Sequence, residues 1–218
     1  MIVGIVGVGF VGSAVKATME NSYQVETFDI ESSLSTTDSI KDLTDKCHLV
    51  FVCVPTPESK DGSVDTSIVE SVLAAIGKSE CAVVLKSTVP PGFTEAESKK
   101  LERDIIFNPE FLTAANAESD YANQNHTILG VTHTGGLTND EYIATKIIGE
   151  ALPHTVIIHT THGVAEMTKY ARNGFLATKV AFANEIWGAC YALNIPYDEV
   201  REFMVMDPRI ADSHLSVP

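Results

Sequence analysis

The sequence has no long apolar run and little positive charge. No stretch approaches the roughly 20 apolar residues of a transmembrane helix, so any membrane role is expected to be peripheral. The apolar residues 1–15 have no Lys or Arg before them and are interrupted by Gly, which indicates a buried strand rather than a secretory leader. Fifteen Lys and Arg face 29 Asp and Glu, for a net charge of -14. Without a basic cluster to hold phosphates, a nucleic-acid partner is not expected.

Cysteine is scarce as well. The four cysteines have neither the paired spacing of metal ligands nor the density of a secreted disulfide scaffold: Cys47, Cys53, Cys81 and Cys190. The sequence therefore predicts no metal site and a reducing, cytoplasmic location. Cys53 falls inside a predicted strand and Cys190 on a predicted helix, so both are expected to be core residues.

What is present is an ordinary globular composition, 44% hydrophobic and 20% charged. Apolar runs of strand length alternate with amphipathic helical stretches, and this alternation predicts an α/β fold with a Rossmann-like, doubly wound parallel sheet of about seven strands. The predicted strands are 2–6, 24–28, 49–54, 82–85, 104–107, 128–131 and 155–158, with a helix around 140–152 between the last two.

Two further helices carry capping signals in the sequence. Ser67 with Glu70, and Thr94 with Glu97, have the spacing of a capping box and are expected to start helices. The second follows a turn at residues 90–92 (PPG), which places that turn at the carboxyl end of a strand.

A long helix is predicted over residues 161–193, where no proline interrupts the apolar pattern. It exceeds the surface of a small domain, so it is expected to link domains or to pack against a second copy, giving a homodimer. The expected organisation is a dinucleotide-binding domain over 1–160, followed by the long helix and the start of a second region over 161–218.

A glycine-rich turn follows the first predicted strand, in residues 7–12 (GVGFVG). In such a turn the first glycine permits the tight bend, the second admits a pyrophosphate, and the third lets helix and strand pack closely. Asp29 ends the second strand, where a carboxylate binds ribose hydroxyls and repels a 2′-phosphate, so NAD is favoured over NADP. A turn needed only for packing is the alternative.

Three later segments end predicted strands: residues 54–57 (VPTP), 86–92 (KSTVPPG) and 108–112 (NPEFL). The carboxyl ends of parallel strands are where open α/β sheets bind ligands, so Thr88 and Glu110 are expected to face one crevice. By residue type alone, Thr88 also suits a helix cap and Glu110 a solvated carboxylate at a helix start.

On the long helix, Lys169 and Asn173 are four residues apart and share a face. A cation and an amide donor on one face would stabilise an oxyanion at a substrate carbon. A lysine on an exposed stripe is the alternative, and spacing alone does not choose between the two.

Taken in order, these segments resemble the UDP-glucose/GDP-mannose dehydrogenase family. The resemblance covers essentially the whole chain and extends to Ala165-Glu166, which precede Lys169 and Asn173, and to residues 183–185 (ANE). It implies that NAD is bound by the turn and by the segments beside it, namely Gly7, Gly9, Phe10, Val11, Gly12, Asp29, Val54, Pro55, Thr56 and Thr88.

The resemblance also implies an activity. Members of the family oxidise the C6 alcohol of a nucleotide sugar to a carboxylate, through two NAD-dependent hydride transfers and a cysteine-bound intermediate. Carried over by position, Lys169 and Asn173 would stabilise oxyanions, Thr88 would position a water, and Glu110 would take part in acid–base work. The substrate is expected to be a UDP-sugar, with UDP-glucose as the default and UDP-N-acetylmannosamine, UDP-N-acetylglucosamine and GDP-mannose as alternatives.

Two departures from the family bear on this activity. Ala114 stands where a second glutamate commonly follows NPEFL. The family's catalytic cysteine lies in a GGxCxPKD segment, which this sequence does not reach, and none of the four cysteines has such a context. The chain is therefore expected to bind NAD without oxidising sugar, as part of a longer enzyme, as a subunit completed by another polypeptide, or as the product of a decayed gene.

Two other functions compete with this interpretation. The 6-phosphogluconate and 3-hydroxyacid dehydrogenases also join a Rossmann domain to a long helix with a lysine and an asparagine, although VPTP and NPEFL disfavour them. A non-catalytic NAD-binding module that dimerises through the long helix is the second alternative.

Overall fold

The computed structural model describes residues 1–113, 115–132 and 135–217. The chain divides into two compact units, Met1–Lys169 and Tyr170–Pro218. This division follows packing, and the functional boundary expected at residue 160 stays a prediction.

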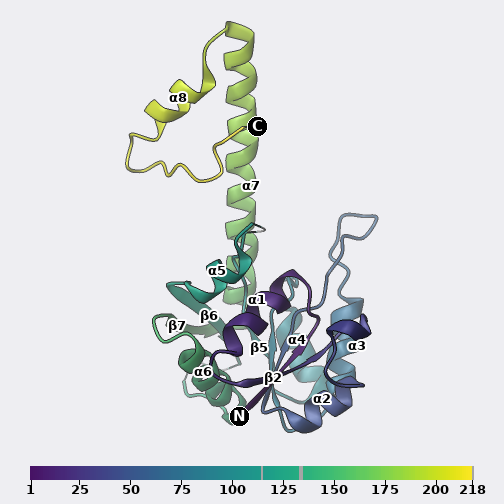
Figure 1. The fold of residues 1–218 in the computed structure, drawn as a ribbon. Coiled ribbons are helices and arrows are strands. Elements are labelled where there is room, and N and C mark those ends of the chain that lie inside the picture. Colours follow the sequence, from purple (N-terminus) through teal and green to yellow (C-terminus); the bar gives the residue numbers. More distant parts are fainter. Residues whose placement is uncertain (114, 133–134, 218) are drawn as a thin grey trace. The chain divides into compact units, whose positions relative to one another are not determined.

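The first unit is built on a seven-stranded sheet of order β2-β1-β3-β4-β5-β6-β7 (Figure 1). Its strands are β1 (Ile2–Val6), β2 (Gln24–Phe28), β3 (Leu49–Val52), β4 (Ala82–Leu85), β5 (Ile106–Phe107), β6 (His126–Val131) and β7 (Val156–Thr161). β3 and β4 consist of buried apolar residues throughout. Such continuous apolar strands are typical of a parallel sheet covered on both faces. The predicted Rossmann-like fold is confirmed, with several strand ends shifted.

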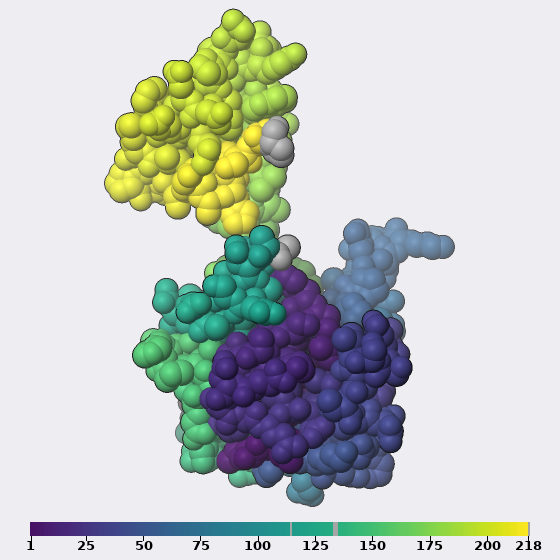
Figure 2. Space-filling view, viewed as in Figure 1, coloured from purple at the N-terminus to yellow at the C-terminus, as the bar shows by residue number. Residues whose placement is uncertain are grey.

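Helices cover both faces of this sheet. They are α1 (Phe10–Met19), α2 (Ile40–Lys46), α3 (Ser67–Ile76), α4 (Phe93–Leu101), α5 (Ala117–Ala122), α6 (Asn139–Ala151) and the start of α7 (His162–Leu193), with a 3-10 turn, η1 (Ser32–Leu34). One apolar core joins α1, α5 and α6 to one face. A second joins α2, α3 and the first turn of α7 to the other. Figure 2 shows α5 lying directly against α1.

The sheet is not parallel throughout, which corrects the sequence-based expectation. β5 and β6 run antiparallel, paired at Phe107 and Gly130, whereas the other neighbours are parallel. Among the described residues of the connection between them, α5 is the helical segment, and β6 enters the sheet from the side at which β5 ends.

This reversal sets the direction of α7. Because β7 is parallel to β6, it ends on the side of the sheet at which β5 begins, and α7 starts there. His162 hydrogen-bonds the carbonyl of Ile105, just before β5 starts. Two turns later Lys169 meets Glu110, just after β5 ends. The helix therefore runs towards the carboxyl ends of the central strands.

Both predicted capping boxes are wrong. α3 begins at Ser67, after the N-cap residue Thr66, and α4 begins at Phe93, after the N-cap residue Gly92. In neither helix does a side chain of the N-cap residue accept a hydrogen bond from the first turn. A capping box forms instead at α6, between Thr138 and Glu141. Gly92 has φ 93°, a left-handed conformation that favours glycine.

The second unit holds the remainder of α7, the short helix α8 (Tyr197–Met204) and the chain that follows it. Its core joins Ala183 and Cys190 of α7 to Tyr197 and Leu215. The Tyr197 hydroxyl donates to the carbonyl of Leu215 at 2.7 Å, which closes the segment after α8. The predicted long helix is confirmed.

Candidate active site

The turn between β1 and α1 combines two glycines required by packing with one that faces open space. Gly7 has φ 87°, and a Cβ on it would lie 2.9 Å from the carbonyl oxygen of Cys53. A Cβ on Gly12 would lie 1.9 Å from the carbonyl oxygen of Gly7. A Cβ on Gly9 would meet nothing within 4 Å. The open space lies at the N-terminus of α1, where unpaired N–H groups favour an anion such as a pyrophosphate.

Asp29 lies immediately after β2 and is bonded on both sides. Its carboxylate accepts hydrogen bonds from the backbone N–H of Val8 at 2.7 Å and of Glu31 at 2.9 Å. Its own N–H donates to the hydroxyl of Ser35 at 2.8 Å. These bonds join the carboxylate to the glycine-rich turn, where it has the chemistry to accept hydrogen bonds from ribose hydroxyls.

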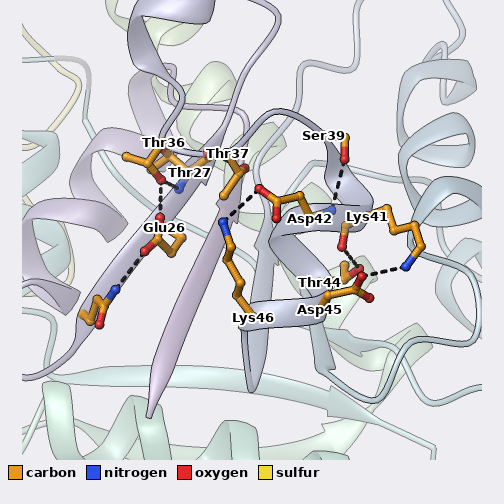
Figure 3. A network of polar contacts seen from close by, with 11 residues as sticks. Glu26, Thr27, Thr36, Thr37, Ser39, Lys41, Asp42, Thr44, Asp45 and Lys46 are labelled. Atoms are coloured by element: carbon orange, nitrogen blue, oxygen red, sulfur yellow. Dashed lines mark hydrogen bonds and ion pairs between the residues drawn. The ribbon is translucent and has the colours of Figure 1, made fainter.

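A polar network holds the chain that follows β2 (Figure 3). The Thr36 hydroxyl accepts a hydrogen bond from the N–H of Thr27 at 2.8 Å and donates to Glu26 at 2.6 Å. The Thr37 hydroxyl donates to the Thr27 carbonyl at 3.0 Å. The hydrogen bond from Thr36, with a second from Gln24, lowers the pKa of Glu26. The strand end that carries Asp29 is therefore held by hydrogen bonds from the chain that follows it.

One cavity of about 620 Å³ unites segments that are far apart in the sequence. Most of the predicted site residues line it: Gly7, Gly9, Phe10, Val11, Asp29, Val54, Pro55, Thr56, Thr88 and Glu110. Gly12 does not, which suits a residue that packs α1 on β1. The carboxyl ends of β1 to β4 thus converge on one cavity, as expected for an open α/β sheet.

Lys169 is hydrogen-bonded to Glu110, one of the residues that line the cavity. Its ammonium donates to the carbonyl oxygen of Glu110 at 2.6 Å and to the Oε1 of Glu110 at 2.5 Å. Both side chains are largely buried, 6% and 14% exposed. The other carboxylate oxygen accepts from the N–H of Leu112 at 2.8 Å. Thr88 and Glu110 therefore share a cavity wall, and Lys169 is bonded to one of them.

Two other positions named from the sequence are not joined to this group. Asn173 belongs to the second unit, so its part in the site stays a prediction. Ala114 lies outside the described residues.

Lys86 is a site residue that the sequence pattern did not single out. It is 3% exposed, lines the cavity and donates to the Oδ1 of Asn108 at 2.7 Å. Its ammonium also lies 5.0 Å from the ring centre of Tyr121. Burial lowers its pKa to about 8, although nearby Cys53 and Glu110 act in the opposite direction. The available signal was a lysine at the end of a wholly apolar strand.

Cys53 also lines the cavity. β3 ends at Val52, two residues before the predicted end at residue 54, so Cys53 follows the strand and does not lie inside it. The residue is half-buried, and burial of its thiol raises the pKa to about 12, with Lys86 opposing the shift. A thiol of this kind is protonated near pH 7 and is a poor nucleophile. The four cysteines, all within the described residues, form no disulfide.

In the part of the chain that the structure describes, no helix has the length and apolarity to cross a bilayer. Within the same residues, no group of three or more His, Cys, Asp and Glu side chains is arranged to hold a metal ion.

Comparison with protein families gives two matches. Residues 25–145 match the NAD binding domain of the UDP-glucose/GDP-mannose dehydrogenase family. Residues 163–217 match the central domain of the same family.

Individual proteins agree with these matches. A putative UDP-glucose 6-dehydrogenase of Bacillus subtilis is 32% identical over 196 residues, which cover 84% of this chain and 44% of that protein. A UDP-glucose 6-dehydrogenase of Pseudomonas aeruginosa is 34% identical over 178 residues, covering 75% of this chain and 38% of that protein. The chain thus spans less than half the length of these two relatives.

Two solved structures share the fold over nearly the whole chain. A UDP-glucose dehydrogenase from Pyrobaculum islandicum superposes with a TM-score of 0.86 at 25% identity, covering 98% of this chain and 58% of that one. A GDP-mannose dehydrogenase from Pseudomonas aeruginosa gives 0.83 at 27% identity, covering 99% and 58%.

Proposed function

The chain belongs to the UDP-glucose/GDP-mannose dehydrogenase family and contains its NAD binding domain, and we propose that it serves the NAD-dependent oxidation of the C6 alcohol of a nucleotide sugar. The observation that carries this proposal is the shared cavity. The glycine-rich turn and Asp29 line it together with Thr88 and Glu110. A dinucleotide held by the first pair would extend towards the acid–base groups of the second.

The cofactor end of the cavity suits NAD rather than NADP. The Asp29 carboxylate is held by two backbone N–H groups. It would accept hydrogen bonds from ribose hydroxyls and repel a 2′-phosphate. The open space at Gly9 leaves room for a pyrophosphate at the N-terminus of α1.

At the other end of the cavity, side chains of the protein would stabilise developing negative charge and transfer protons. Bound NAD supplies the hydride acceptor. The Lys169 ammonium would stabilise an oxyanion that forms on the substrate carbon, with Asn173 as a further donor. The Glu110 carboxylate, held by Lys169 and the N–H of Leu112, would exchange a proton with a water that Thr88 orients.

We further propose that residues 1–218 alone bind NAD without turning over sugar. The chemistry implied by the family requires a reactive thiol. The thiol of Cys53, the cysteine that lines the cavity, has a pKa of about 12. A thiolate is the nucleophilic form, so Cys53 does not supply that group near neutral pH.

The substrate proposed by default is UDP-glucose. Both UDP-glucose and GDP-mannose dehydrogenases are among the structures that the chain resembles, and assays with the two nucleotide sugars distinguish the substrates. A cytoplasmic location is proposed from the four unpaired cysteines.

We also propose a homodimer formed through α7. Several large apolar side chains of that helix are exposed, among them Phe175 (66%), Tyr191 (78%) and Leu193 (69%). Exposed apolar patches mark protein–protein interaction sites, and a second copy of the chain is proposed to cover these side chains. A monomer mass in solution scattering at high protein concentration would refute the dimer.

The decisive test is calorimetric titration of the chain with NAD and NADP, then addition of UDP-glucose while NADH absorbance is followed. Binding of NAD in preference to NADP, without NADH formation, supports the proposal. Preference for NADP contradicts the role of Asp29. Steady NADH production by residues 1–218 contradicts the account of the thiol.

A further inference from the structure

One face of the first turns of α7 carries three buried polar residues. His162, Glu166 and Lys169 follow the i, i+4, i+7 spacing of a single helix face, and all three are at most 5% exposed. Each bonds a different segment of the first unit. His162 meets the chain before β5, and Lys169 meets Glu110.

Glu166, between them, is wholly buried and reaches the start of α4. Its Oε2 accepts a hydrogen bond from the N–H of Gly92 at 2.6 Å, and its Oε1 accepts one from the N–H of Thr94 at 2.8 Å. α4 has no cap from its own sequence. A carboxylate from 72 residues further along the chain therefore performs the capping, where the helix dipole also favours negative charge.

The segment that Glu166 holds is the one that carries Thr88. At its near end, the Ser87 hydroxyl donates to the carbonyl of Val54 at 2.7 Å. Val89 is completely buried. At its far end, Gly92 is bonded by Glu166. Thr88 is thus placed between an anchor on the strand side and an anchor on α7.

Close packing makes this reach possible. Ala165 packs against Gly130 on β6, where an added Cβ would lie 2.9 Å from the Cβ of Ala165. Any larger residue at 130 would push the helix away from the sheet. The backbone of α7 therefore lies near enough for a glutamate side chain to span the gap to α4.

We propose that Glu166 is a positioning residue, which fixes the loop bearing Thr88 relative to Lys169 one turn further along the same helix. A single turn of α7 then sets two reacting groups: Glu166 places Thr88, and Lys169 holds Glu110. This inference rests on the proposed function, because Thr88 and Glu110 matter as a pair only if the site performs acid–base chemistry.

Glu141 provides a matched control. It is also a buried glutamate, 1% exposed, and its two carboxylate oxygens accept backbone hydrogen bonds from Thr132 at 3.0 Å and Thr138 at 2.9 Å. It does not line the cavity. If both carboxylates only stabilise the fold, replacing Glu166 and replacing Glu141 should have the same effect. If Glu166 positions Thr88, only its replacement should lower kcat.

The experiment compares Glu166→Gln with Glu141→Gln in the full-length natural protein, assayed with NAD and UDP-glucose. Both variants should lower the melting temperature by similar amounts, because each loses one charge-assisted hydrogen bond to the backbone. Glu166→Gln should in addition lower kcat by about 10²-fold, the effect of a displacement near 1 Å at a reacting group. Its KM for NAD should change much less than kcat, because the glycine-rich turn and Asp29 at the cofactor end make no contact with Glu166.

The outcomes separate this inference from the proposed function. A wild-type protein that binds NAD but oxidises none of UDP-glucose, UDP-N-acetylmannosamine, UDP-N-acetylglucosamine and GDP-mannose overturns the proposed function, and the inference with it. An active wild type with equal kcat in Glu166→Gln and Glu141→Gln overturns the inference alone. If Glu166→Gln does not fold, Thr94→Pro, which removes one of the two N–H donors within the first helical turn, tests the same contact.

Discussion

Lys169 and Glu110 are 59 residues apart in sequence and joined by two hydrogen bonds, one to the main-chain oxygen of Glu110 and one to its carboxylate. The side chains are largely shielded from water. A buried pair of this kind depends on both partners, because either charge left alone would be desolvated without compensation. The same pair joins the loop after β5 to α7.

Breaking this pair should be costly. Lys169→Met leaves the Glu110 carboxylate without its cation, and we expect a loss of about 3–5 kcal/mol in the free energy of unfolding, measured by urea denaturation. The double variant Lys169→Met with Glu110→Gln should recover part of this loss. Lys99→Met, in the exposed pair with Glu95, serves as the control and should change little. Additive losses in the double variant would show that the two side chains are not coupled.

The two glycines of the turn should respond in opposite ways to a methyl group. Gly9→Ala should fold normally, since its Cβ would meet no protein atom, but should weaken NAD binding by at least about tenfold because that space is where the pyrophosphate is expected. Gly12→Ala should destabilise the fold itself, because its Cβ would collide with the backbone of Gly7. Thermal unfolding and NAD titration distinguish them. Undiminished NAD affinity in Gly9→Ala would place the cofactor elsewhere.

Asp29 should govern the choice of cofactor. Asp29→Asn removes the charge that accepts ribose hydroxyls, and we expect NAD affinity to fall about 10- to 100-fold, the equivalent of about 1.5–3 kcal/mol for hydrogen bonds to a charged group. The preference for NAD over NADP should shrink at the same time. Asp45→Asn, on the exposed surface of α2, is the control. Equal losses for NAD and NADP would show that Asp29 supports the turn without reading the ribose.

The stability conferred by Lys86 should depend on pH. Its pKa of about 8 lies below the ordinary lysine value of about 10.4, so between these values the unfolded chain binds more protons than the folded one. The contribution of Lys86 to the free energy of unfolding therefore rises with pH through this window, by at most about 1.4 kcal/mol per pH unit. Below pH 7 it is constant.

Comparison with Lys86→Met isolates this effect. Burial raises the pKa values of Cys47, Cys53 and Tyr121, so these groups lower the free energy of unfolding as the pH rises. Their effect is common to both proteins between pH 8 and pH 10, because the Cys53 thiol, which Lys86 influences, has a pKa of about 12 and stays protonated in the folded state. Between pH 8 and pH 10, the free energy of unfolding measured by urea denaturation should therefore increase in the wild type relative to Lys86→Met. Parallel curves for the two proteins would mean that Lys86 keeps its ordinary pKa.

Cys53 should resist alkylation in the folded chain. With a pKa of about 12, only about one thiol in 10⁴ is ionised at pH 8. Iodoacetamide labelling followed by mass spectrometry should leave Cys53 unmodified, whereas the same cysteine in urea should react readily. Rapid labelling of the folded chain would reopen Cys53 as a candidate nucleophile.

Much of this fold could be predicted from local patterns. Buried parallel strands are apolar throughout, so β1, β3 and β4 are visible as runs, and the glycine-rich turn announces the β1–α1 junction. Because strand ends converge at one edge of the sheet, Thr88 and Glu110 could be expected to share a cavity. These features depend on residues close together in sequence.

The rest depends on contacts that leave no local signal. The antiparallel pairing of β6 with β5 joins residues that are distant in sequence, Phe107 and Gly130. The cap of α4 comes from Glu166 on a distant helix, so the local Thr94 and Glu97 were misleading. Lys86 resembles any polar residue that ends a strand until Asn108 is placed beside it. Burial and long-range partners distinguish Glu166 and Lys86 from solvated side chains of the same type, and neither property can be read from sequence spacing.

The late position of α7 in the chain has a consequence for synthesis. The glycine-rich turn, Asp29 and residues 54–56 leave the ribosome long before Lys169, which completes the polar contacts around Glu110. At about 5–20 residues per second, the delay from residue 56 to residue 169 is roughly 6–23 s. During that interval the nascent chain holds the cofactor half of its cavity while the cap of α4 and the cation beside Glu110 are still missing. We therefore expect nascent chains arrested before residue 160 to expose the start of α4 to proteases, and chains arrested well beyond residue 169 to protect it.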